Sequence, residues 1–238
     1  MNSYLLFGTY GILVLISLQS TFLEFTEQDL AYHMIIEHSL FFVMGTMSVQ
    51  IAERILKLFV SSLRNKPGKT RTRTLKWAVV SFWTRLLRKL FTINRFGYVW
   101  IAIAVALLTF WHIPTVFDFA ELHESIHILQ HISFIVVGAA GFLTARSLGE
   151  SFKLFVLFAL NGIMGFAGLM FSVLDRPVYL VYSVNSHNNA GTYMLVSCII
   201  LLLVVLPAYL IRRTLFHMRD RQSASSFSTP SSSQKATK

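Results

Sequence analysis

Residues 190–211 read AGTYMLVSCIILLLVVLPAYLI and contain no charged side chain. About 20 apolar residues, rising 1.5 Å each, cross the roughly 30 Å hydrocarbon core of a bilayer. Pro207 near the end of this stretch is compatible with a spanning helix, because neighbouring helices can satisfy the backbone groups that a proline leaves free. The stretch therefore predicts a membrane-spanning helix.

Five further apolar runs precede this one, and the composition of the whole chain agrees with a membrane protein. The chain is 54% hydrophobic and 13% charged, whereas soluble domains carry about 25% charged residues. The runs are 4–19, 31–51 with a more polar continuation to 60, 98–113, 126–145 and 152–174. The first run has no basic flank and no clear cleavage motif, so we expect an uncleaved helix rather than a signal peptide. We predict an all-α, polytopic membrane helix bundle of about six transmembrane helices over residues 1–221.

The basic residues gather in alternate connections between these runs. They lie mainly in the long connection 61–96, at Arg146 and Lys153, and after the sixth run. The other connections are mostly acidic and hold Glu24, Glu27, Asp29, Asp118, Glu121, Glu124 and Asp175. Positive residues favour the cytoplasmic side, so we expect both termini in the cytoplasm and the chain in the cell membrane. The net charge of +10 then reflects orientation in the membrane and not a nucleic-acid partner.

Two segments outside the apolar runs have distinctive compositions. Residues 75–91, within the basic loop 61–96, mix tryptophan and leucine with lysine and arginine. This mixture is typical of a helix lying in the headgroup region of an anionic leaflet, so membrane lipids are expected partners; a protein docking surface is the alternative. Residues 222–238 are Ser-rich and are predicted to form a disordered cytoplasmic tail.

Histidines gather near the predicted outer face of the membrane. The eight are His33, His38, His112, His123, His127, His131, His187 and His217, of which only His217 falls on the inner side. The spacing of four from His123 to His131 places three imidazoles on one helical face. Ionisable groups inside a membrane are costly and mark functional sites by default. Converging imidazoles predict a site for Cu, Zn, Ni or haem iron.

The second apolar run suggests which metal. His33, Glu37, Met44 and Met47 form a rough stripe at helical spacing. Thioether sulfur beside imidazole favours Cu(I), which makes copper the first expectation. The carboxylates Glu37, Glu121 and Glu124 are candidates either to bind the metal or to orient an imidazole.

Several of these residues have simpler interpretations. His123 and His187 lie in outer connections, where a solvated histidine is ordinary, and His112 lies at an interface that attracts aromatic residues anyway. Met44 and Met47 also fit plain packing. The glycines of the fourth and fifth runs let helix backbones approach closely, and we interpret them as packing residues; they are Gly138, Gly141, Gly162, Gly165 and Gly168. The lone Cys198 excludes an internal disulfide and a CxxC motif.

Four blocks of sequence resemble a known family. They are WHIPTVFD at 111–118, HILQHISF at 127–134, FSVLDRPVY at 171–179 and HMIIEH at 33–38. These blocks resemble the CtaG-type membrane proteins linked to assembly of caa3-type cytochrome c oxidase, which show WH-[LI]-P…YD…H-x-x-x-H, an FSDRP-like stretch and H-M-x-x-H. The chain is short for that family and is also similar to small archaeal membrane proteins of uncharacterised function. The resemblance implies copper handling on the outer face during oxidase maturation.

One block departs from the family pattern. Glu37 occupies the position of the second histidine, and His38 follows one residue late. Adjacent residues of a regular helix are about 100° apart, so His33 and His38 cannot share a face there. Either Glu37 replaces the histidine or a local bulge brings His38 round.

We therefore expect a membrane metal-binding protein, with copper as the metal, that assists assembly or metallation of a copper-dependent membrane oxidase. The expected ligands are His33, His112, His127 and His131, completed by Glu37 or His38. No hydrolase pairing, phosphate loop or dinucleotide fingerprint is present, so an enzyme is not predicted. The alternatives are a b-type haem protein for electron transfer and a non-catalytic accessory subunit of a membrane complex.

Overall fold

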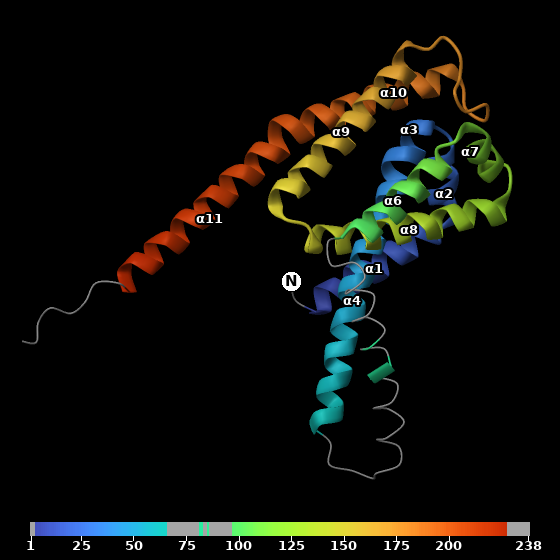
Figure 1. The fold of residues 1–238 in the computed structure, drawn as a ribbon. Coiled ribbons are helices and arrows are strands. Elements are labelled where there is room, and N and C mark those ends of the chain that lie inside the picture. The colour runs from blue at the N-terminus through green and yellow to red at the C-terminus, as the bar shows by residue number, and fades with distance from the viewer. Residues whose placement is uncertain (1–2, 66–80, 83–84, 86–96, 228–238) are drawn as a thin grey trace, which may run out of the picture.

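The structure is a computed structural model that describes residues 3–65, 81–82, 85 and 97–227. Within these residues the chain is helical and contains no strand (Figure 1). The predicted lipid-surface helix at 75–91 lies outside the described residues, apart from Ser81, Phe82 and Arg85. Of the predicted tail at 222–238, residues 228–238 also lie outside them.

Each of the six predicted runs corresponds to a long helix or a short series of helices. They are α1 (Ser3–Ser17), the series α3 (Leu30–Tyr32), η1 (His33–Glu37) and α4 (His38–Asn65), α6 (Tyr98–Trp111), α8 (Glu124–Ser147), α9 (Glu150–Val173), and the series α10 (Val184–Ile200), η2 (Leu201–Val205) and α11 (Leu206–Phe227). Four of these are long and apolar enough to cross a membrane, and there are six if each of two bent helix pairs is one span. The all-α fold class and the four to six apolar spans are confirmed.

Two short helices, not predicted from sequence, follow sharp bends. α2 (Ser20–Glu27) leaves α1 at 67°, and α7 (Pro114–Glu121) leaves α6 at 73°. The second bend has a local cause: a residue before proline avoids the α region, and Ile113 is extended at φ −66° and ψ 123°. Pro114 then starts α7 at a position where its missing N–H costs nothing. Both helices fold over the end of the bundle and bring acidic residues there.

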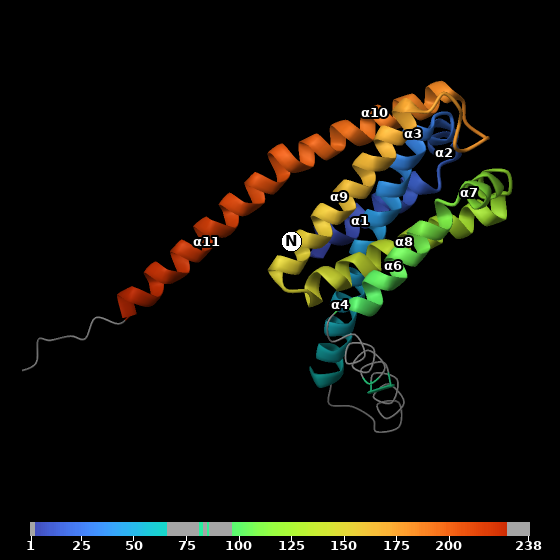
Figure 2. The ribbon, with the colours of Figure 1, turned by 45° about the horizontal axis from the view of Figure 1, so that its top comes forward.

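α8 crosses α4 and runs alongside α6 (Figures 1 and 2), and glycine makes the crossing of α4 and α8 close. A Cβ at Gly45 would lie 2.8 Å from the backbone nitrogen of Ala139, and one at Gly138 would lie 2.9 Å from the Cα of Phe42. Small residues at such crossings let helix backbones touch and van der Waals contacts form. The packing role predicted for Gly138 is therefore confirmed, and the crossing sets the histidine-bearing turns of α4 and α8 face to face.

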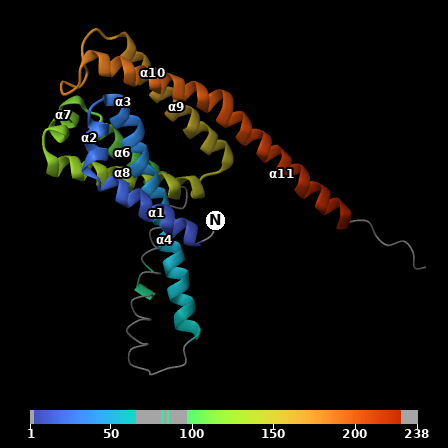
Figure 3. The ribbon, with the colours of Figure 1, turned by 180° about the vertical axis from the view of Figure 1, so that it is seen from behind.

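α9 and α10 form a second pair, which packs on the first through α3. Gly168 and Gly191 meet at this pair, since a Cβ at Gly168 would lie 3.0 Å from the Gly191 carbonyl oxygen. The Ser186 hydroxyl of α10 accepts a hydrogen bond from the Leu30 amide of α3 at 2.7 Å. α10, η2 and α11 continue as one rod that leaves the other helices (Figure 3) and extends to Phe227, beyond the predicted start of the tail.

Candidate metal centre

A π-helical turn places His33, Glu37 and His38 toward one another. The His38 amide donates to the His33 carbonyl, five residues earlier, across η1. This wider turn brings the two imidazoles together, with 3.1 Å between their Nε2 atoms. Glu37 also faces His33, since its Oε2 lies 3.0 Å from His33 Nδ1. The local bulge considered from sequence is thus present, and Glu37 joins the same cluster.

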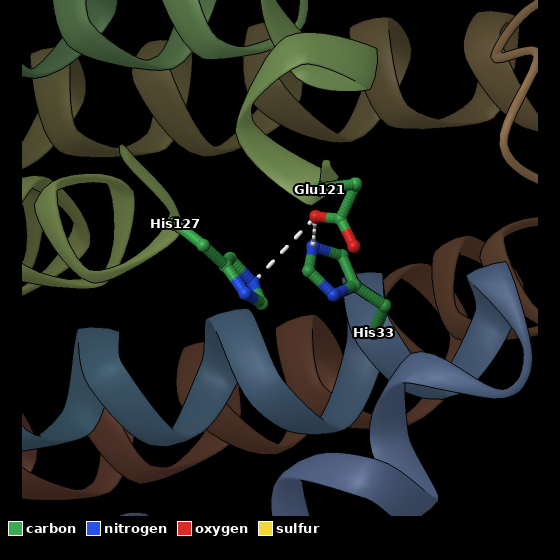
Figure 4. A group of neighbouring side chains, drawn as sticks. All are labelled: His33, Glu121 and His127. Carbon is green, nitrogen blue, oxygen red and sulfur yellow. Dashed lines mark ion pairs between the residues drawn. The ribbon is translucent and has the colours of Figure 1, made fainter. Parts of the chain in front are cut away.

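α8 presents two imidazoles to this turn. The rings of His127 and His131 have centroids 4.2 Å apart, one helical turn from each other. His127 Nε2 lies 3.5 Å from Glu121 Oε1 and 3.8 Å from Glu37 Oε1, and His131 Nε2 contacts the same Glu37 oxygen. Figure 4 shows Glu121 between His127 and His33, whose Nε2 lies 3.4 Å from Glu121 Oε1.

Two further groups hold members of the cluster in place. The Thr26 hydroxyl of α2 donates to Glu37 Oε2 at 2.9 Å. At the end of the same helix, Glu27 Oε1 lies 3.4 Å from His127 Nδ1. The α2 helix therefore contributes an oxygen partner to one carboxylate and to one imidazole of the cluster.

The loop before α10 supports Glu121. The Tyr182 hydroxyl donates to Glu121 Oε2 at 3.3 Å. Burial and the neighbouring Glu121 carboxylate raise the pKa of Tyr182 above its ordinary value, so the phenol keeps the proton that it donates. His187 shapes this loop, because its Nε2 accepts the amides of Val178 at 3.2 Å and Tyr179 at 3.1 Å.

The cluster is buried, and several of its donor atoms lack hydrogen-bond partners among the described residues. His33 and Glu37 are fully buried, and His127 and His131 are each 8% exposed. Four of the facing atoms have no hydrogen-bond partner among the described residues; they are Glu37 Oε1, Glu121 Oε1, His127 Nε2 and His131 Nε2. A buried polar group left in this way costs about 1–3 kcal/mol. A cation bound among these atoms would provide a missing partner.

The spacing of the donors suits a metal ion. Two ligands at about 2.0–2.2 Å from a tetrahedral metal lie roughly 3.3–3.6 Å apart, and the Glu121 oxygen lies 3.4 and 3.5 Å from its two imidazole neighbours. Two triads have all their ligand atoms within 4.8 Å of one another: His33, Glu121 and His127, and Glu37, His127 and His131. The residues present therefore fit a transition-metal ion.

Five of the six residues predicted as ligands meet in this cluster, and His112 lies at its edge. Four of them, His33, Glu37, His127 and His131, belong to the triads. His38 lies outside the triads, and its Nε2 contacts the Nε2 of His33. The His112 ring centroid lies 5.9 Å from that of His38, and its Nδ1 lies 2.7 Å from the carbonyl oxygen of Leu108. His112 is outside both triads.

The other candidates divide between the cluster and ordinary structure. Glu121, considered from sequence as a ligand or an orienting group, is in the first triad, whereas Glu124 is exposed. His123 is exposed, as expected, but His187 is 1% exposed and holds the loop, so the expectation of a solvated side chain was wrong for it. Met44 is buried in an apolar cluster with Phe41, Trp111 and Phe134.

Sequence reasoning missed the supporting residues Thr26, Glu27 and Tyr182, and it also missed the buried Gln130. Gln130 is fully buried on α8 between the two cluster histidines, and its side-chain oxygen and nitrogen have no hydrogen-bond partner among the described residues. Gln130 could have been found from the sequence, because a polar amide directly before His131 interrupts an apolar helix. Tyr182 offered no such signal, because its approach to Glu121 depends on the path of the loop.

The fold and this cluster define an all-helical protein with four to six apolar spans, compatible with a membrane protein, and with a buried histidine–glutamate cluster. The family described as "Protein of unknown function (DUF1404)" matches residues 9–212, and the chain belongs to that family. No curated protein and no solved structure matches the chain. The family match supports a relation to proteins of uncharacterised function and gives no support to the CtaG-type resemblance.

Proposed function

We propose that this protein binds a copper ion at the histidine–glutamate centre and delivers it to a copper-dependent membrane oxidase during assembly of that enzyme. One observation carries the metal-binding part: buried imidazole and carboxylate atoms from the π-turn η1, α7 and α8 face one another without hydrogen-bond partners among the described residues. The role is binding and transfer and not catalysis.

The donor chemistry supports a first-row transition metal. Imidazole suits Zn, Cu, Fe and Ni, and among divalent ions copper binds a given site of nitrogen and oxygen most tightly. The two triads offer two imidazoles and one carboxylate each. Met44, whose thioether suggested Cu(I), packs among apolar side chains. The donors that face one another therefore favour Cu(II) as the bound form.

The supporting carboxylates strengthen this proposal. A metal-binding histidine usually donates its second ring N–H to a carboxylate, which fixes the tautomer and the ring orientation. Glu37 Oε2 is 3.0 Å from His33 Nδ1, and Glu27 Oε1 is 3.4 Å from His127 Nδ1. The contact with Glu27 leaves the His127 Nε2 lone pair toward Glu121 and Glu37, whereas His33 Nε2 faces both Glu121 Oε1 and His38 Nε2. His127 is therefore the imidazole best prepared to bind the ion.

The orientation and the recipient rest on sequence. The basic connections favour cytoplasmic termini, which would place the centre near the outer face of the cell membrane. There it would take copper from the extracytoplasmic side. The resemblance to CtaG-type proteins in the blocks at 33–38, 111–118, 127–134 and 171–179 supports oxidase subunits as the recipients.

A haem protein is the second candidate, and the packing around the imidazoles disfavours it. Phe41 stacks on the His131 ring at a centroid distance of 4.2 Å, and Phe134 lies 4.0 Å from the His38 ring. Phe117 approaches the His33 ring edge-on at 5.3 Å. These aromatic rings occupy space beside the imidazoles that a porphyrin would need, whereas a bare ion fits between the donors.

Metal analysis of the full chain, purified in detergent and loaded with Cu(II), tests the proposal. We expect stoichiometric copper in the unaltered protein and none in the double variant His127→Ala, His131→Ala. His123→Ala is the matched control, because His123 is an exposed histidine at the N-cap of α8 and lies outside both triads. Unchanged copper in the double variant would refute the site, and a Soret band in the absorption spectrum would establish haem instead. Copper-free protein that co-purifies with oxidase subunits would favour an accessory subunit.

A further inference from the structure

We propose that the centre holds one ion in either of two overlapping positions, which share His127, and that the ion passes between them without leaving the protein. The Glu121 position consists of His33, Glu121 and His127, and the Glu37 position consists of Glu37, His127 and His131. This inference rests on the proposed metal binding and concerns how the ion moves through the site.

The geometry of His127 makes the two positions mutually exclusive. Its Nε2 lies 3.5 Å from Glu121 Oε1 and 3.8 Å from Glu37 Oε1, so the same nitrogen faces both carboxylates. The other ring nitrogen, Nδ1, faces Glu27 Oε1 at 3.4 Å. A neutral imidazole with Nδ1–H directed at a carboxylate has a single lone pair, on Nε2, and binds one metal ion. Two ions cannot therefore share His127.

The two positions are related by one helical turn on each helix series. On α8 the ligand changes from His127 alone to His127 with His131, four residues further along. In the π-turn η1 the ligand changes from His33 to Glu37, which is also four residues further along the chain. One turn of helix is about 5.4 Å, so the ion moves by roughly that distance or less. The step breaks the bonds to His33 Nε2 and Glu121 Oε1 and forms bonds to Glu37 Oε1 and His131 Nε2.

The two positions have the same kinds of ligand, so the free energy of the bound ion differs little between them. Each position provides two imidazoles and one carboxylate, so the ion keeps its oxidation state and the same formal ligand charge in both. His127 stays bound throughout. The ion therefore exchanges two of its three protein ligands and is never released.

Burial treats the two positions alike. The side chains of His33 and Glu37 are fully buried, that of Glu121 is 8% exposed, and those of His127 and His131 are each 11% exposed. The side chain of Glu27, which is 41% exposed, faces Nδ1 of His127 and not the Nε2 that binds the ion. Burial therefore favours neither position, and the ion passes between them in both directions.

Cobalt titration of the full chain in detergent tests the inference, because the visible absorption of Co(II) reports its ligand geometry. We expect one Co(II) per chain in the unaltered protein. Glu121→Gln removes only the Glu121 position and His131→Ala only the Glu37 position, so each variant should still bind one Co(II), with an affinity lowered by less than about tenfold, and the two spectra should differ. His127→Ala should lower the affinity more than about 100-fold.

The outcomes separate this inference from the proposed function. Two Co(II) ions per unaltered chain, or identical spectra for Glu121→Gln and His131→Ala, would overturn the shared-ligand arrangement while leaving metal binding intact. Loss of all Co(II) in either of these two single variants would show one undivided site and would also overturn it. Absence of any bound Co(II) or Cu(II) in the unaltered chain would overturn both proposals.

Discussion

Gly138 of α8 lies against the backbone of Phe42 in α4: a Cβ added to Gly138 would stand 2.9 Å from the Phe42 Cα. Gly45 of α4 meets Ala139 of α8 in the same manner. Both contacts lie about two helical turns from the cluster, since Gly138 follows His131 by seven residues on α8. The glycines therefore fix how the two helices cross, and through that crossing they fix the distance between the imidazoles of α8 and the carboxylate of Glu37.

Gly138→Ala is expected to weaken copper binding without touching a ligand. The added methyl group must push α4 and α8 apart, and overpacking of this kind costs about 1–3 kcal/mol. Copper affinity should fall at least tenfold, and the thermal unfolding midpoint in detergent should fall as well. Gly162→Ala in α9 is the control, because nothing lies within 4 Å of a Cβ there. Equal affinity in the two variants would show that the crossing does not set the site.

Tyr182→Phe is expected to lower copper affinity by less than about tenfold, since the phenol is a partner of Glu121 alone and the Glu37 position still binds the ion. The change removes only the hydroxyl that donates to Glu121 Oε2 at 3.3 Å. The measurement is competitive titration with a copper chelator of known affinity. Tyr193→Phe provides the comparison, because Tyr193 is 51% exposed on α10. A Tyr182→Phe protein with the affinity of the unaltered chain would exclude an orienting role for this phenol.

His187→Ala is expected to destabilise the loop 178–182. His187 Nδ1 donates to the Ser183 carbonyl at 2.8 Å, because Nε2 is occupied as the acceptor of the Val178 and Tyr179 amides. Removing the ring takes the acceptor from the Val178 and Tyr179 amides, at about 1–3 kcal/mol each. Amide exchange in the loop should become faster by mass spectrometry, whereas the exposed His123→Ala should leave it unchanged. Unaltered exchange in His187→Ala would contradict this structural role.

The sequence predicted the helices well because hydropathy and length decide them in a membrane. The run predicted at 152–174 is α9 at Glu150–Val173, and the run at 126–145 is α8 at Glu124–Ser147. The ends differ by a few residues because polar residues at the helix ends carry no hydropathy signal. The eight-residue helices α2 and α7 escaped prediction because each is too short and too polar to stand out from a connection.

Only those parts of the candidate site that follow from the spacing of residues along one helix could be predicted from the sequence. The interval of four in His127–His131 and in His33–Glu37 places each pair on one face. The π-turn that adds His38 depends on a hydrogen bond between His38 and the carbonyl of His33, which no spacing rule anticipates. Glu121 reaches His33 only because α6 and α7 bend by 73°. Long-range packing therefore determines the contact between Glu121 and His33, which the local sequence pattern does not predict.

Met44→Leu decides between the thioether and the imidazole–carboxylate donors. Met44 is 5% exposed and packs with Phe41, Trp111 and Phe134, so leucine should replace it with a stability loss under about 1.5 kcal/mol. Since no thioether is needed by the two triads, the content of Cu(II) and the affinity for Cu(I), measured under reducing conditions, should both stay within about twofold of the unaltered protein. Loss of Cu(I) binding alone, with the Cu(II) content retained, would instead make Met44 a ligand for the reduced ion and place a second copper-binding function further along α4.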